Sequence, residues 1–124
     1  MLNAISYTRT SQDEDNDQIV FQELAIQKWV VANKVQLISS FSDTGYSDET
    51  LDRPSFKQMQ EFMANHHLDI DLLLVLSPDR LGYCTEEIFP FLIHANEELQ
   101  IQLMRVDYES LKVDPPDKRK GFWY

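Results

Sequence analysis

Three short stretches of the sequence place an arginine among groups that suit phosphate chemistry. In "YTRTS", Arg9 stands two residues before Ser11, and "LDRP" and "PDRL" contain Arg53 and Arg80. A guanidinium binds planar oxyanions through paired hydrogen bonds, and a serine hydroxyl becomes an effective nucleophile only where a base or charge stabilisation assists it. Taken alone, the first stretch is typical both of an anion-activated nucleophile and of the polar end of a strand.

The residues after Ser11 offer a structural alternative. "SQDE" has the Ser-x-x-Glu spacing of a capping box, in which the two side chains satisfy free backbone N–H groups at a helix start. Ser11 is therefore a candidate nucleophile or a candidate helix cap. The choice depends on whether the other two arginines reach the same place.

Four apolar runs are expected to form the strands that position these residues. They span 2–7, 35–41, 70–76 and 101–106, and the third is apolar at successive positions, as a strand buried on both faces would be. Helical stretches at 17–33, 52–65 and 85–99 alternate with them. This order predicts a single α/β domain with a mostly parallel sheet of four or five strands, right-handed crossovers and helices on both faces.

Capping residues and prolines set the expected helix ends. Asp17, Asp52 and Thr85 are expected to cap the three helices, and Pro54 stands near the first helical position of the second. Pro90 is expected to kink the third helix or to delay its start.

Apolar spacing predicts the buried face of two helices. On the first helix the expected buried residues are Ile19, Val20, Leu24, Ala25, Trp29 and Val30. On the second they are Phe56, Met59, Phe62 and Met63. Both faces are interpreted as core.

The predicted fold also predicts where the site lies. Ligands of open α/β sheets bind at the carboxyl ends of the strands. The three arginine-bearing stretches all follow predicted strands, so three of the chain's five arginines, Arg9, Arg53 and Arg80, are expected on one rim. Arginines that converge in this way indicate a site for phosphate or carboxylate.

The composition restricts the class of protein. The chain has 124 residues, which suits one domain, and 21 Asp and Glu against 11 Lys and Arg give a formal charge of −10. That charge opposes autonomous DNA binding, which depends on cations displacing counterions from phosphates. With no signal-like start and no membrane-length apolar run, a cytoplasmic protein is expected. Cys84 is a single cysteine, so neither an internal disulfide nor a cysteine zinc cluster is expected.

The order of the motifs resembles one protein family. "AISYTRTS", "DTGYSDETLDRPSFKQM" and "LLLVLSPDRLGY", in this order and at these separations, resemble the catalytic domain of serine recombinases, the resolvase and invertase group. The resemblance covers roughly residues 3–107. It implies a resolvase-like catalytic domain at 1–107 and a short C-terminal tail at 108–124 with no DNA-binding domain.

The resemblance implies a mechanism for site-specific DNA recombination. Ser11 would attack a DNA phosphodiester, leaving a 5′-phosphoserine link and a free 3′-hydroxyl before strand exchange. The family uses no metal, no cofactor and no nucleotide energy, because the phosphoserine bond conserves the energy needed for religation. The catalytic residues implied by the resemblance are Ser11, Arg9, Arg53, Asp79, Arg80 and Gln22.

Two positions depart from the family pattern. Tyr83 stands where members usually carry a further arginine, and Ser77, followed by Pro78, stands where a lysine is common. Loss of one preorganised donor lowers a rate by roughly 10²–10³. With the short tail and the acidic charge, these departures leave a second interpretation open: a truncated, catalytically impaired recombinase-like module for interaction or regulation.

Both interpretations imply macromolecular partners. The chain is expected to bind DNA only weakly on its own, because of its acidic charge. The resemblance further implies a homo-oligomer, or a hetero-oligomer with a recombinase. No membrane and no small-molecule substrate are expected.

A third interpretation is a phosphoacceptor receiver domain. Such a domain binds Mg²⁺ between acids after its first strand and an aspartate after its third, here Asp79. The candidate acids are Asp13, Glu14, Asp15 and Asp17. They come too late after the strand for that arrangement, and Arg9 would crowd the metal.

Overall fold

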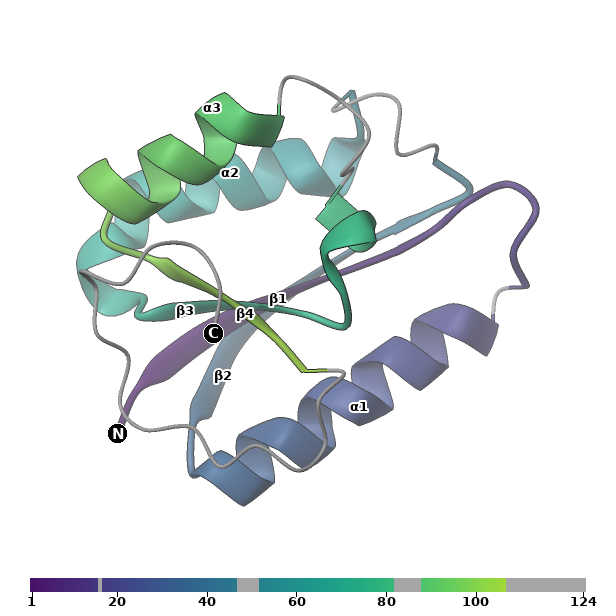
Figure 1. The fold of residues 1–124 in the computed structure, drawn as a ribbon, viewed down its shortest axis with the longest axis horizontal. Coiled ribbons are helices and arrows are strands. Elements are labelled where there is room, and N and C mark those ends of the chain that lie inside the picture. The colour runs from purple at the N-terminus through teal and green to yellow at the C-terminus, as the bar shows by residue number, and fades with distance from the viewer. Residues whose placement is uncertain (16, 47–51, 82–87, 107–124) are drawn as a thin grey trace.

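A parallel four-stranded sheet runs through the centre of the molecule (Figure 1). The computed structural model describes residues 1–15, 17–46, 52–81 and 88–106. Its strands are β1 (Asn3–Thr10), β2 (Gln36–Thr44), β3 (Leu72–Val75) and β4 (Gln102–Arg105), in the spatial order β2, β1, β3, β4. Each predicted apolar run contributes one of these strands, and every neighbouring pair is parallel, so the predicted α/β fold is confirmed.

The two central strands are buried on both sides. All of β3 is buried, as is β1 from Ala4 onward, which explains why the third apolar run lacks polar alternation. β1 pairs with β2 along its whole length but with β3 only from Ala4 to Ser6. The carboxyl end of β1 therefore extends beyond β3, and the backbone at Arg9 needs partners from outside that strand.

Helices cover both faces of the sheet. α1 (Asp17–Asn33) lies on one face, and α2 (Pro54–His66) and α3 (Ile88–Ile93) lie on the other (Figure 1). Three short helical turns are η1 (His67–Asp69), η2 (Pro78–Leu81) and η3 (His94–Glu98). Among the described residues, no helix has the length and apolar character needed to cross a membrane.

α2 buries the predicted face, whereas α1 buries only part of it. Phe56, Met59 and Met63 are buried beneath α2, with Phe62 partly buried beside them. On α1 the buried residues are Gln22, Ile26, Trp29 and Val30. Of the six residues predicted for that face, Val20 and Leu24 are instead exposed. The prediction is confirmed for Trp29 and Val30 and wrong for Val20 and Leu24. It failed in part because α1 carries apolar residues on two faces, and periodicity alone cannot tell which one meets the sheet.

The helix starts differ from the predicted caps. Asp17 is the first residue of α1 rather than the residue before it, and Thr85 lies outside the described residues. α2 begins at Pro54, as its fixed φ favours, but Asp52 does not cap it. Asp52 instead forms an exposed ion pair with Lys57. Pro90 occupies the first turn of α3 as described, and the predicted helix start at 85 lies outside the described residues.

Candidate active site

The three predicted arginines meet at the carboxyl edge of the sheet, around η2. The backbone carbonyl of Arg80 accepts hydrogen bonds from Arg9 Nε at 3.1 Å and from Arg53 Nη1 at 3.2 Å. Arg80 Nη1 in turn donates to the carbonyl of Arg9 at 3.0 Å. The strand order reverses between β1 and β3, which is where α/β sheets place their ligands. The predicted convergence is therefore present.

Arg9 is a buried crosslink between loops. It is 4% exposed, and all three of its guanidinium nitrogens donate to backbone carbonyls. Besides Arg80, the acceptors are Tyr46 at 2.6 Å and Asp79 at 2.8 Å. Arg9 thus ties the segment after β2 to the segment after β3, and it holds the η2 backbone in place.

Arg53 is completely buried. It is 0% exposed, it donates from Nη2 to the Leu81 carbonyl at 2.6 Å, and its guanidinium lies 4.6 Å from the centre of the Phe56 ring. Burial lowers the pKa of this guanidinium. Its Nε is buried without a hydrogen-bond partner among the described residues. The residue is a buried cation supported by carbonyls and an aromatic ring.

Tyr7 and Asp43 complete this network, and sequence reasoning missed both. The Tyr7 hydroxyl accepts from Arg53 Nη1 at 3.0 Å and donates to Asp43 Oδ2 at 2.8 Å. Asp43 also accepts from the backbone N–H groups of Ser55 and Phe56, at 2.9 and 3.0 Å, so it caps α2 from a distance. Burial raises the pKa of Tyr7 strongly, which keeps its hydroxyl protonated.

A signal for Asp43 was present in the sequence. "FSDTG" ends a predicted strand, as the arginine-bearing stretches do, and the same strand-end rule covers the carboxylate. What the sequence lacks is the partner, because Asp43 and Ser55 lie in different elements on either side of a loop. Asp43, twelve residues before Ser55, accepts the N–H groups at the start of α2 that the nearer candidate Asp52 was expected to accept.

Ser11 lies just beyond β1, in a turn closed by Glu14. The Glu14 carboxylate accepts the Ser11 backbone N–H at 3.0 Å, and the Glu14 N–H donates to the Ser11 carbonyl at 3.3 Å. The first contact is one arm of the predicted capping box, but α1 begins at Asp17 rather than at this turn. The Ser11 side chain remains partly exposed.

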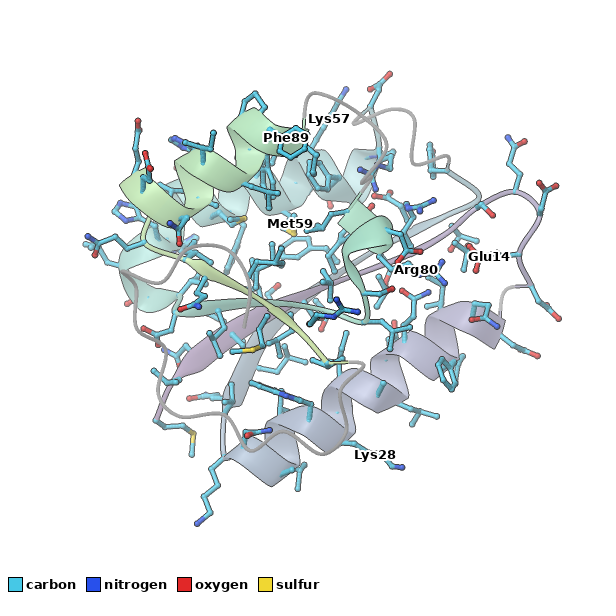
Figure 2. All side chains as sticks on the ribbon, in the orientation of Figure 1. Glu14, Lys28, Lys57, Met59, Arg80 and Phe89 are labelled. Atoms are coloured by element: carbon cyan, nitrogen blue, oxygen red, sulfur yellow. The ribbon has the colours of Figure 1, made fainter. Side chains whose placement is uncertain are left out.

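The same carboxylate holds Arg80. Arg80 Nη1 lies 2.7 Å from Glu14 Oε1 and 3.0 Å from Oε2, with side chains 12% and 29% exposed (Figure 2). The hydrogen bond from Arg80 lowers the pKa of Glu14 to about 2, and the Ser11 N–H acts in the same direction. Glu14 therefore places an anion between Ser11 and Arg80.

Gln22 supplies hydrogen-bond partners for the backbone at the end of β1. It is buried, its Oε1 accepts the Arg9 N–H at 3.1 Å, and its Nε2 donates to the Arg9 carbonyl at 2.9 Å. These contacts replace those that β3 would make if it extended this far. A side-chain amide presents an N–H donor and a carbonyl acceptor side by side, so it can pair with both backbone groups of one residue.

Asp79 acts through its backbone more than through its carboxylate. Its carbonyl accepts from Arg9, whereas its side chain is largely exposed and lies 3.8 Å from Arg80 Nε. The Ser77 hydroxyl donates to the Asp79 carboxylate. In the described ranges no group of three metal-ligating side chains gathers.

The family model described as "Resolvase, N terminal domain" matches residues 4–121. The chain belongs to the resolvase family. A search of curated proteins gives no match.

Solved structures of recombinases share the fold. A resolvase family site-specific recombinase from Streptococcus pneumoniae is similar with a TM-score of 0.72 at 18% identity, covering 97% of this chain and 78% of that one. The N-terminal catalytic domain of TP901-1 integrase gives a TM-score of 0.67 at 22% identity, covering 85% and 77%. The C-terminal catalytic domain of ISC1926 TnpA, an IS607-like serine recombinase, gives 0.72 at 17%, covering 90% and 71%.

Membership of the resolvase family replaces the receiver-domain interpretation. The two departures from the family pattern are at Ser77 and Tyr83. Ser77, in place of a common lysine, supplies a hydroxyl to Asp79 instead of a charge. Tyr83 lies outside the described residues.

Proposed function

We propose that this chain is the catalytic domain of a serine recombinase and that Ser11 is its nucleophile toward a DNA phosphodiester. In the step proposed, Ser11 Oγ forms a bond to phosphorus while the bond to the 3′ oxygen breaks. Ser11 loses its proton and the departing 3′ oxygen gains one, so the products are a 5′-phosphoserine and a free 3′-hydroxyl. The phosphodiester energy is kept in the new ester, and the reverse step rejoins the strands.

One observation carries the proposal: Ser11 and the Arg80 guanidinium are bridged by a single carboxylate. Glu14 contacts the Ser11 N–H at 3.0 Å and Arg80 Nη1 at 2.7 Å. The Glu14 carboxylate fills the space between the Ser11 N–H and Arg80 Nη1. Two oxygens of a phosphate could occupy the same space, because carboxylates and phosphates accept hydrogen bonds from the same N–H donors. Arg80 is thus the residue best placed to stabilise charge on a phosphate attacked by Ser11.

Arg9 and Arg53 act in this proposal as positioning residues. Both are buried and both donate to the Arg80 carbonyl, so they fix the backbone from which the Arg80 side chain extends. Gln22 fixes the Arg9 backbone, and Tyr7 and Asp43 fix Arg53. A phosphate then meets an arginine whose geometry is set before binding, which is the condition for electrostatic catalysis.

Glu14 competes with a DNA phosphate for the Arg80 guanidinium in this proposal. The depressed pKa of Glu14 keeps it ionised at neutral pH, so it competes with phosphate as an anion. A DNA phosphate has to displace this pair or bind the opposite edge of Arg80. Replacing Glu14 with Gln is therefore expected to raise the rate of strand cleavage.

The test uses the full chain joined to the DNA-binding segment of a resolvase-family recombinase whose site is defined. Supercoiled DNA with that site is incubated with the fusion, and covalent protein–DNA adducts are separated under denaturing conditions. Wild type is expected to give an adduct, and Ser11→Ala is expected to give none. Ser40→Ala, on the exposed side of β2, is the matched control and should behave as wild type.

Labels on the two DNA ends show which end of the broken strand carries the protein. The strand downstream of the break should carry the protein at its 5′ end, and the upstream strand should be released with a free 3′-hydroxyl. An adduct of equal yield from Ser11→Ala would remove Ser11 as the nucleophile.

A second candidate function is supported by the same contacts. Arg80 is paired with Glu14, and Arg9 and Arg53 are committed to carbonyls, so all three arginines already have partners. An impaired recombinase-like module would keep this arrangement and bind a full-length recombinase without cutting DNA. Efficient cleavage by the fusion above would exclude this candidate.

A further inference from the structure

The outward face of α1 is apolar. Phe21, Leu24 and Val31 are 59%, 60% and 76% exposed, and with Ala25 and Lys28 they line a groove along the helix. Figure 2 shows Lys28 pointing away from the sheet, so this face is not the one that packs on the core. Spacings of three, four and seven residues keep these side chains on one side of a helix, and exposed apolar patches of this kind mark interaction sites.

The described lining of the groove comes from α1 alone, and the surface of a single helix is convex. The sheet lies on the other side of α1, and α2 and α3 lie beyond the sheet (Figure 1). Among the described residues, this face of α1 therefore has no partner.

The C-terminal segment is the one best placed to cover this face. Residues 107–124 follow Val106, which packs in the same core cluster as Trp29. The other internal segments outside the described ranges, 47–51 and 82–87, precede α2 and α3 on the opposite face. Because it follows a residue of the core beneath α1, the C-terminal segment is the candidate occupant of this face.

The chemistry of that segment matches the groove. It ends in Phe122, Trp123 and Tyr124, preceded by the basic run 118–120. The N-terminal end of α1 and the turn before it are acidic, with Asp13, Asp15 and Asp17 all exposed. Its 18 residues reach about 60 Å when extended, against roughly 25 Å for the length of α1.

We propose that residues 118–124 dock in cis on the outward face of α1. The aromatic residues 122–124 cover Phe21, Leu24 and Val31, and the basic run 118–120 lies toward the acidic end of the helix. Aromatic rings supply the apolar area that this stripe lacks, and the opposite charges fix the direction of the segment.

Limited trypsin digestion of the full chain tests this docking, because 118–120 is a cluster of trypsin sites. Cleavage requires the segment to leave the helix, so its rate follows the undocked fraction. Leu24→Glu is expected to raise cleavage at 118–120 roughly tenfold over wild type, with cleavage after Lys57 as the internal reference. The products are counted by mass spectrometry of the C-terminal peptides.

Two further variants make the outcome decisive. Leu68→Glu, at a position 89% exposed on η1, is the matched control and should cleave as wild type. If circular dichroism shows Leu24→Glu to be unfolded, Val31→Glu takes its place. Equal cleavage of wild type and the folded α1 variant overturns the proposal. Sedimentation that shows a dimer lost in Leu24→Glu, with tail cleavage unchanged, also overturns it and assigns the face to a second copy.

Discussion

At the scale of single residues, Arg80 is where a buried polar network meets solvent. Its backbone carbonyl is held by Arg9 and Arg53, while its side chain reaches a partly exposed carboxylate. Buried arginines are costly unless every donor finds an acceptor, and here backbone carbonyls supply most of them. The network therefore serves to fix geometry, and the accessible chemistry lies at Ser11, Glu14 and Arg80.

The Glu14 contact makes stability depend on pH. Its pKa is lowered from 4.5 to about 2 in the folded chain, so its contribution is present above pH 4.5 and is lost as the pH falls through about 2. Because solvent screens a partly exposed ion pair, Glu14→Gln should lower the free energy of unfolding by about 1 kcal/mol at pH 7, and the difference from wild type should shrink between pH 4.5 and 2.

Urea unfolding at several pH values measures this difference. Asp13→Asn, at an exposed position in the same turn, is the control and should track wild type. A Glu14→Gln penalty that stays constant down to pH 2 would contradict the ion-pair account.

The Tyr7 hydroxyl is expected to contribute to the stability of the fold through its two buried hydrogen bonds. Tyr7→Phe leaves Arg53 and Asp43 each without one buried partner, so the free energy of unfolding should fall by about 1–3 kcal/mol. Tyr46→Phe is the matched control, because Tyr46 contacts Arg9 through its backbone carbonyl. Urea unfolding at pH 7 compares the two, and equal losses would argue against a special role for the Tyr7 hydroxyl.

At the scale of elements, the residues that follow α1 and β2 have left-handed backbone conformations. Lys34 follows α1 with φ of 55°, and the Val35 N–H bonds to the Val30 carbonyl, as in a Schellman motif. Glycine is the usual residue at this left-handed position. Lys34→Gly should therefore raise the free energy of unfolding by roughly 0.5–1 kcal/mol, measured by urea unfolding. A loss of stability would show that Lys34 makes a compensating contact.

Gly45 is the converse case. Its φ of 80° closes the turn after β2, where its N–H bonds to the Thr10 carbonyl and places Tyr46 on Arg9. An added Cβ meets no atom within 4 Å, so the cost of Gly45→Ala is that of the backbone alone, about 1–2 kcal/mol. Gly45→Asn should lose less, because asparagine tolerates this conformation. Thermal melting compares the variants, and equal losses for Ala and Asn would point to some other cause.

At the scale of the whole molecule, the sequence predicted what depends on local pattern. Four apolar runs gave the sheet, and strand-end logic brought Arg9, Arg53 and Arg80 to one rim. The pairing of Glu14 with Arg80 and the capping of α2 by Asp43 join residues far apart in the chain. No local pattern encodes such pairs, so they emerged only from the structure.

The prediction for α1 held for Trp29 and Val30 but failed for Val20 and Leu24, for a related reason. Ile26 and Leu24 are both apolar, yet Ile26 meets the sheet and Leu24 faces outward. A helix with two apolar faces has no unique orientation until its partners are known. The outward face of α1 is apolar but does not pack on the core. Exposed apolar patches of this kind mark interaction sites, which is the basis of the docking proposal.

The net charge of −10 also belongs to this scale. An acidic body repels DNA, so binding to a phosphate depends on local geometry at Arg80 and on partners that supply cations. This is why the functional test is made with a fusion that delivers DNA to the domain.

The most direct measurement maps the residue that becomes joined to DNA. The adduct from the fusion is digested with nuclease and trypsin, and mass spectrometry locates the remaining nucleotide. Cleavage after Arg9 and Lys28 gives a peptide of residues 10–28 that contains Ser11. The account predicts a phosphonucleotide on Ser11 within that peptide. A nucleotide on any other residue, or an adduct-free reaction that still cuts and rejoins DNA, would contradict it.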